Sequence, residues 1–278
     1  MRCSSFLFGL ACVVSFLLMA PDADAENCLK CHDDTEVPIS FAHSSNDVSC
    51  TSCHGESKAH LDKSRNPPDV VFSKHASGEA TNGSCQSCHN DTAQMHWDGG
   101  AHGQADLSCA GCHQSHGTED AVITQSGEVE VCTSCHQDLK ASLNYPSRHP
   151  IREGDVTCSS CHAPHGSVAD NGLKGHSPTD TCVECHEDKR GPFLFEHEPV
   201  AEDCGLCHKP HGSVLPSLLT ARSPFLCQQC HMAASHPSQL ADGTTLAGGS
   251  SNMLAKGCGN CHSQVHGSNH PAGARLTR

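Results

Sequence analysis

The sequence predicts a chain that is mostly coil with short α-helices and little or no β-structure, and three observations support this. The 278 residues include 24 Gly and 15 Pro, which favour turns over long regular elements. Aromatic residues make up 4% of the chain and the mean hydropathy is −0.41, so the polypeptide alone has little apolar surface to bury. A five-residue word, Cys-x-x-Cys-His, recurs ten times at short intervals. We therefore expect the chain to fold around bound groups.

The Cys-x-x-Cys-His word is the attachment signal for c-type haem. Its two thiols form thioethers with the haem, and the adjoining His becomes the proximal iron ligand. Ten copies use twenty of the 22 cysteines, which predicts a multihaem cytochrome c whose coil and short helices wrap around a chain of ten covalent haem c groups. The predicted thioether residues are Cys28, Cys31, Cys50, Cys53, Cys85, Cys88, Cys109, Cys112, Cys132, Cys135, Cys158, Cys161, Cys182, Cys185, Cys204, Cys207, Cys227, Cys230, Cys258 and Cys261. The predicted proximal ligands are His32, His54, His89, His113, His136, His162, His186, His208, His231 and His262.

Two other uses of paired cysteines fit the pattern less well. Disulfides are common in exported proteins, but they do not need a His after every pair. Zinc sites also use Cys-x-x-Cys, but zinc ribbons bring two such pairs close together and rarely follow every second Cys with His. We therefore interpret all ten words as haem sites.

Residues 1–25 have the features of a cleaved signal peptide. The apolar run from Phe6 to Ala20 is shorter than the roughly 20 residues that a spanning helix needs. Ala23-Asp24-Ala25 is a small-x-small cleavage site, and the alternative is an uncleaved anchor. Export would leave residues 26–278 as one decahaem cytochrome domain in the periplasm.

The words form an internal repeat. Words three to six recur as words seven to ten, and each even-numbered word has additional histidines on both sides. The chain thus divides into five cassettes, each an odd word followed by an even word. The flanking histidines, from cassette one to cassette five, are His43 and His60, His102 and His116, His149 and His165, His197 and His211, and His236 and His266.

These ten cassette histidines match the ten haems in number, so we expect each to be a distal iron ligand. A haem with His on both sides has no open position for a substrate and only transfers electrons. Of the 24 histidines, four then remain: His75, His96, His176 and His270. His75 and His176 could be ligands in another pairing, and His270 competes with His266 for one role.

Two helices and two loops are expected between the words. Residues 131–142 and 181–189 are each long enough for two or three helical turns, with the word at the start of the helix. Residues 62–83, which contain Pro67-Pro68, and residues 241–257, rich in Gly and Ser, are typical of surface loops.

The net charge and the number of candidate iron ligands limit the functions that this chain could have. A net charge of −14 argues against nucleic acid as a partner, because nucleic acid favours a basic surface. An enzyme would need a haem with a vacant distal position, yet all ten words end in His and candidate distal ligands outnumber haems. We therefore predict an electron carrier with no catalytic residues. The alternatives are a soluble periplasmic electron shuttle and, less favoured, a multihaem reductase with an open haem site.

Four segments of the sequence resemble a known protein family. The segments 191–200, 204–213, 226–231 and 261–271 resemble the decahaem periplasmic cytochromes of outer-membrane porin–cytochrome conduits, the DmsE/MtrA type. The resemblance implies a haem wire inserted in an outer-membrane β-barrel porin. It further implies a periplasmic or inner-membrane quinol-linked cytochrome on one side and an extracellular cytochrome or reductase on the other. Polar, irregular backbone is not tolerated in lipid, so a chain of this kind that crosses a membrane needs another protein to shield it.

Overall fold

The computed structural model describes residues 25–32, 38–73, 75–91, 93–231 and 257–278. The chain separates into two compact units, Met1–Val70 and Val71–Arg278. Residues 1–24 of the predicted signal peptide and residues 241–256 of the predicted loop lie outside the described residues. The expectation of a single domain after the signal peptide stays a prediction.

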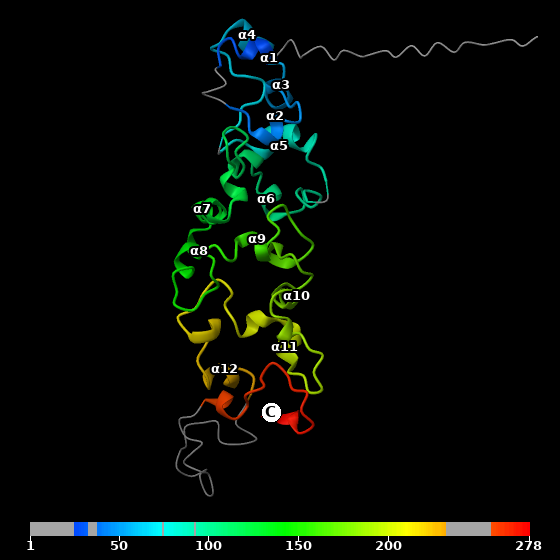
Figure 1. Ribbon diagram of the computed structural model, residues 1–278, viewed down its shortest axis with the longest axis vertical. Helices are drawn as coiled ribbons and strands as arrows, with labels where there is room; N and C mark the ends of the chain where they lie inside the picture. The colour runs from blue at the N-terminus through cyan, green and yellow to red at the C-terminus, as the bar shows by residue number, and fades with distance from the viewer. Residues whose placement is uncertain (1–24, 33–37, 74, 92, 232–256) are drawn as a thin grey trace, which may run out of the picture. The chain divides into compact units, whose positions relative to one another are not determined.

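Short helices joined by turns make up both units (Figure 1). The first unit contains α1 (Ala25–Cys28), α2 (Phe41–Ser44), α3 (Cys50–His54) and α4 (Lys58–Asp62). The α-helices of the second unit are α5 (Gly78–Gln86), α6 (Ala101–Gln104), α7 (Gln125–Cys135), α8 (Gln137–Ser142), α9 (Cys158–Cys161), α10 (Pro178–Val183), α11 (Glu198–Glu202) and α12 (Phe225–Gln228). Its 3₁₀ turns are η1 (Cys109–Gly111), η2 (Ala121–Ile123), η3 (Asp170–Gly172), η4 (Glu187–Lys189), η5 (Cys204–Leu206), η6 (Pro216–Leu218), η8 (Cys258–Asn260) and η9 (Gly273–Arg275).

The expected fold class is confirmed: the described residues form short helices and coil, with no strand. Backbone pairing is limited to isolated antiparallel bridges, such as Ser147 with Ser213 and Phe195 with Ser268. These two bridges join residues of different cassettes, so they fix the register between one cassette and the next.

Odd and even words occupy opposite ends of their helices. Words two, four, six, eight and ten begin a short helix or 3₁₀ turn, as expected. Words three, five, seven and nine instead lie at the end of one, because the helix starts upstream of the word. Thr124 Oγ1 accepts from the Gly127 N–H to cap α7, and Ser177 Oγ accepts from the Asp180 N–H to cap α10.

Three sequence expectations are corrected accordingly. The helix expected over 181–189 is instead α10, which begins at Pro178 and ends at Val183, followed by the separate turn η4. The helix expected to start at Val131 begins at Gln125, and the loop expected through Gly83 ends where α5 begins at Gly78. In α5, Thr81 Oγ1 bonds the Ser77 carbonyl and also lies 2.8 Å from Ser108 Oγ, which anchors the helix beside the start of word four. Sequence periodicity did not predict where α5 and α7 start. Hydrogen bonds of polar side chains define these starts, and no apolar stripe marks them.

The polypeptide buries very few apolar side chains. Within the described residues, only Leu143 and Val183 are buried hydrophobic residues, whereas Thr81, Ser108, Glu128 and Ser213 are among the buried polar ones. A chain of this size ordinarily has a continuous apolar core. The scarcity agrees with a fold organised around cofactors. None of the described helices is long and apolar enough to span a membrane.

Candidate haem centres

Each word folds as a single tight turn that gathers its three functional groups. In nine of the ten words the backbone N–H of the His donates to the carbonyl of the first Cys, with N···O distances of 2.8 to 3.0 Å across the turn. The remaining word, word two at Cys50, forms α3 itself. One helical turn brings residues one, four and five onto one side, so both thiols and the imidazole can meet a single macrocycle.

In the part of the chain that the structure describes, seven word histidines lie beside a cassette histidine. Ring centroids in these pairs are 5.9 to 6.2 Å apart, and the interplanar angles run from 15° to 54°. The pairs are His32–His60, His102–His136, His113–His165, His149–His186, His162–His211, His197–His231 and His208–His266.

This separation fits an iron between the two rings. Metal–imidazole bonds are about 2 Å long, so two bonds in line plus a ring radius on each side give about 6 Å between centroids. The residues present therefore suit haem c with an imidazole on each face of the macrocycle.

Backbone carbonyls orient many of these imidazoles. The Nδ1–H of His102 donates to the Pro164 carbonyl at 2.9 Å, and His149 and His197 bond the carbonyls of Pro210 and Val265 at the same distance. A carbonyl only accepts, so the proton is on Nδ1 and the lone pair on Nε2 is free to bind a metal. The word histidines His162, His208 and His262 make the equivalent bond to Asn171, Ser217 and Arg275.

Six of the seven ring pairs follow one rule along the chain. The histidine upstream of an even word pairs with the His of the next odd word, as in His102–His136. The His of that even word pairs with the histidine downstream of the next even word, as in His113–His165. Cassettes two and three, three and four, and four and five are each joined by two such pairs. The pair His32–His60 lies inside cassette one.

The backbone geometry requires glycine directly after two of the paired histidines. Gly166 and Gly212 follow the paired histidines His165 and His211 and have φ of +105° and +142°. A Cβ at Gly166 would lie 2.3 Å from the His96 carbonyl oxygen, and one at Gly212 would lie 2.2 Å from that of Ser142. The backbone of one cassette thus packs directly on the cassette before it, which holds the ring pairs in register.

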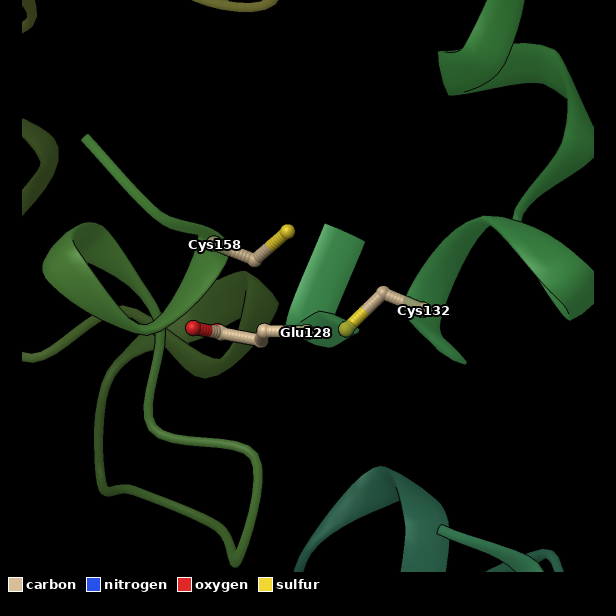
Figure 2. Close-up of side chains that lie close together, drawn as sticks. All are labelled: Glu128, Cys132 and Cys158. Atoms are coloured by element: carbon tan, nitrogen blue, oxygen red, sulfur yellow. The ribbon is translucent and has the colours of Figure 1, made fainter. Parts of the chain in front are cut away.

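The first cysteines of the two words in a cassette also meet. Figure 2 shows Cys132 and Cys158 with the carboxylate of Glu128, and their ligand atoms lie within 4.8 Å of one another. As thiols they share a hydrogen bond, which raises the pKa of Cys132 and lowers that of Cys158. Glu128 is engaged with the backbone N–H and hydroxyl of Ser159, at 2.6 and 3.1 Å. Because thioether formation consumes both thiols, we interpret this cluster as the meeting point of two haem edges and not as a separate metal site.

Burial keeps three cassette imidazoles neutral. Desolvation lowers the pKa of His165 and His211, and nearby histidines lower it further. The pKa of His266 is also lowered, mainly by desolvation and then by Lys189. A neutral imidazole is the form that binds metal.

Three cassette histidines are outside the seven pairs. His43 Nδ1 lies 3.0 Å from Ser40 Oγ, His116 is exposed, and His236 lies outside the described residues. Of the spare histidines, His75, His176 and His270 are exposed. His270 Nδ1 accepts from the Ala272 N–H at 3.1 Å, whereas His266 is the residue beside His208.

Sequence reasoning missed one residue of the site. Asp120 Oδ2 lies 2.7 Å from His113 Nδ1, where other even words use a backbone carbonyl. The sequence does contain one sign of this difference, in the spacing. The hydrogen-bond partner follows the word His by seven residues in word four and by nine in words six and eight.

Comparison with known proteins places the chain among multihaem cytochromes. A doubled CXXCH motif model matches residues 149–191 and 197–236, and a cytochrome c-type protein NrfB-like model matches residues 50–135. The chain is 46% identical over 271 residues to multiheme cytochrome MtrA of Shewanella baltica, covering 91% of this chain and 81% of that protein. It is 26% identical over 167 residues to cytochrome c-type protein NrfB of Haemophilus influenzae, covering 57% of this chain and 63% of that protein.

Proposed function

Because this chain belongs to the family of multihaem c-type cytochromes that includes MtrA, we propose that it is a haem wire carrying electrons through an outer-membrane porin. The observation that carries the proposal is the set of seven histidine ring pairs at 5.9 to 6.2 Å. Bound haem supplies a one-electron couple at each word. The protein would then supply two histidine ligands to each iron and keep neighbouring haems close together.

The histidines close the irons. In the proposal every haem has two imidazole ligands, so no iron has room for a substrate. The seven observed partners are His60, His102, His149, His165, His197, His211 and His266, and we propose His43, His116 and His236 as the other three distal ligands. Hydrogen bonds such as that from His149 to Pro210 hold the rings against rotation.

The cassettes keep neighbouring haems close. Two irons shared between successive cassettes would join them, as at His149–His186 and His162–His211. Within a cassette, Cys132 and Cys158 lie close together and would hold the two haems of that cassette near each other. The two kinds of contact alternate along the chain and favour transfer from haem to haem over release to solvent.

The proposed location is the periplasm, after cleavage of residues 1–25, in association with the outer membrane. A porin would shield the polar backbone from lipid. Electrons would be exchanged with a periplasmic or inner-membrane quinol-linked cytochrome and with an extracellular cytochrome or reductase. Acidic charge, −14 in total, favours basic docking surfaces on the partners over nucleic acid.

Reconstitution tests the proposal. Liposomes are loaded with a reduced dye and placed in a suspension of iron oxide. The cytochrome together with its cognate porin should oxidise the dye, and either protein alone should not. If no porin co-purifies from native membranes and the reconstituted pair transfers no electrons, the wire is refuted in favour of a soluble periplasmic shuttle. A native protein with an open, substrate-binding haem would instead favour a reductase.

A further inference from the structure

One haem centre differs from its repeats in the group behind its proximal ligand. His162, His208 and His262 donate Nδ1–H to the neutral backbone carbonyls of Asn171, Ser217 and Arg275. His54, in word two, bonds the Val70 carbonyl in the same way at 3.0 Å. His113 instead donates to a carboxylate, Asp120 Oδ2, at 2.7 Å.

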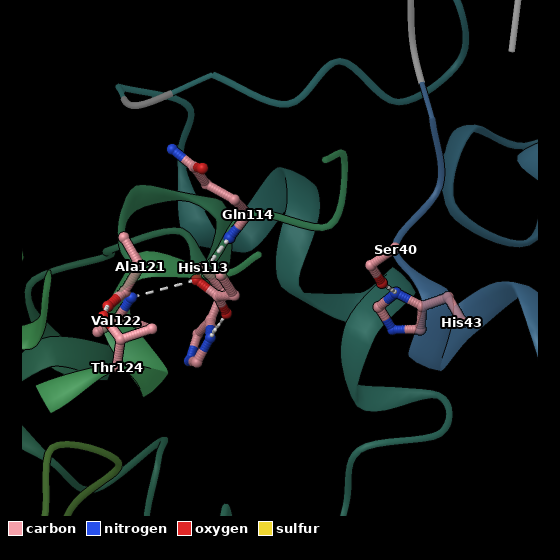
Figure 3. Close-up of polar contacts among 8 residues, drawn as sticks. Ser40, His43, His113, Gln114, Ala121, Val122 and Thr124 are labelled. Carbon is pink, nitrogen blue, oxygen red and sulfur yellow. Dashed lines mark hydrogen bonds and ion pairs between the residues drawn. The ribbon is translucent and has the colours of Figure 1, made fainter. Parts of the chain in front are cut away.

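The Asp120 carboxylate is fixed in place. Its second oxygen, Oδ1, accepts from the backbone N–H of Gln114 at 3.2 Å and of Val122 at 3.4 Å. The side chain caps η2 and is 16% exposed, so it is largely shielded from water. Figure 3 shows His113 with Gln114, Ala121, Val122 and Thr124 gathered at this turn. Asp120 is therefore part of the turn and not a loosely associated surface charge.

We propose that Asp120 is a positioning residue that lowers the reduction potential of the haem bound at Cys109 and Cys112 relative to its counterparts in words six and eight. A carboxylate behind a ligating imidazole raises the basicity of that ligand. A more basic, more negative ligand stabilises the ferric state more than the ferrous state. The inference rests on the proposed function, because it takes His113 as an iron ligand.

The size of the effect follows from the two kinds of hydrogen bond. A bond to an ionised acceptor is roughly twice as strong as a neutral one. We expect a change of about tenfold in the equilibrium constant for reduction, which corresponds to about 59 mV for a one-electron couple. The haem of word four would then have a lower reduction potential than the haems on either side, and it would accept electrons more slowly than they do.

One spectroscopic signal isolates this haem among its neighbours. In the holoprotein, H165A removes the ring opposite His113 and should leave a single five-coordinate ferrous haem. Its iron–histidine stretching vibration, measured by resonance Raman scattering, reports on the hydrogen bond made by His113 Nδ1. Matched controls are H211A and H266A, which open the haems of His162 and His208, where the acceptor is a backbone carbonyl. The stretch should be higher in frequency in H165A than in either control.

Substitution at position 120 then tests the residue itself. An Asn side chain is neutral and has one acceptor oxygen, so it cannot replace both oxygens of the Asp120 carboxylate. D120N in the H165A background should therefore lower the stretching frequency to that of the controls. D120E should retain a higher frequency, and E119Q, which removes an adjacent exposed charge, should leave it unchanged. A stretch in H165A equal to the controls and unmoved by D120N overturns the proposal while leaving the bis-histidine assignment intact. Failure of H165A to open any haem would instead refute the His113–His165 ligation in the proposed function.

Potentiometry of the full chain provides an independent measurement. With His165 intact, D120N should raise the potential of one haem by about 59 mV relative to the native protein. E119Q should shift it less, because its effect is screened by solvent. Equal titration curves for native protein and D120N, at equal haem content, would overturn the proposal.

Discussion

Removal of one distal histidine should open one haem and no other. The His149 ring centroid lies 6.2 Å from that of His186, and its Nδ1–H donates to the Pro210 carbonyl at 2.9 Å. In H149A the iron of His186 loses its sixth ligand, so about one carbon monoxide should bind per molecule, roughly a tenth of the haem. Loss of the hydrogen bond should cost about 1 kcal/mol of folding free energy in addition to the lost iron bond.

The assay is a carbon monoxide titration of the dithionite-reduced protein, followed in the Soret band, with a ferric electron paramagnetic resonance spectrum for spin state. H176A is the matched control, because His176 is exposed and takes part in none of the described ring pairs. Adding C182A and C185A to H149A should abolish carbon monoxide binding, because those changes remove the opened haem. If H149A stays fully low-spin, or if H176A binds as much carbon monoxide, the ring-pair reasoning is refuted.

Three further predictions concern the cofactor count, the path and the packing. Intact mass of the protein matured in a haem-ligating host should fit ten haems on a chain starting near Glu26, and a mass fitting fewer haems, or zinc without haem, would contradict this. C132A with C135A should remove a central haem and sharply reduce transfer across porin-containing liposomes, whereas a soluble shuttle should lose much less. G212A should destabilise the holoprotein by about 1–3 kcal/mol in denaturant unfolding, because its Cβ would meet the Ser142 carbonyl oxygen at 2.2 Å; G83A, where a Cβ meets nothing within 4 Å, should be neutral or slightly stabilising.

The fold class was predictable because its cause is local. Ten words, frequent Gly and Pro and few aromatics leave short helices around haem as the consistent solution. Helix starts were less predictable. The start at Gln125 depends on a capping hydroxyl. The start at Gly78 depends on bonds to residues far along the chain, such as that from Asn82 Nδ2 to the Leu107 carbonyl at 2.9 Å.

The candidate ligands were recognisable by type, but their partners were not. His102 lies close to word four in sequence yet pairs with His136 of word five. That choice is made by contacts between cassettes, such as the His102–Pro164 bond and the close approach of Gly166 to His96. Sequence spacing shows none of these. The full set of ten distal ligands stays a prediction, which the seven observed pairs support.

Asp120 shows the limit of reading repeats by similarity. Words four, six and eight share nearly the same phrase, so the repeat predicts one environment for His113, His162 and His208. A shorter turn after word four replaces the carbonyl acceptor with a carboxylate. A change of this kind alters the electronic properties of one haem without altering the attachment word.

The central claim is that every iron is closed by two histidines, and the spin state of the native ferric protein tests it most directly. Electron paramagnetic resonance with spin quantitation should show only low-spin haem, and the reduced protein should bind no carbon monoxide. A high-spin signal amounting to one haem or more per molecule, accompanied by carbon monoxide binding, would contradict the claim.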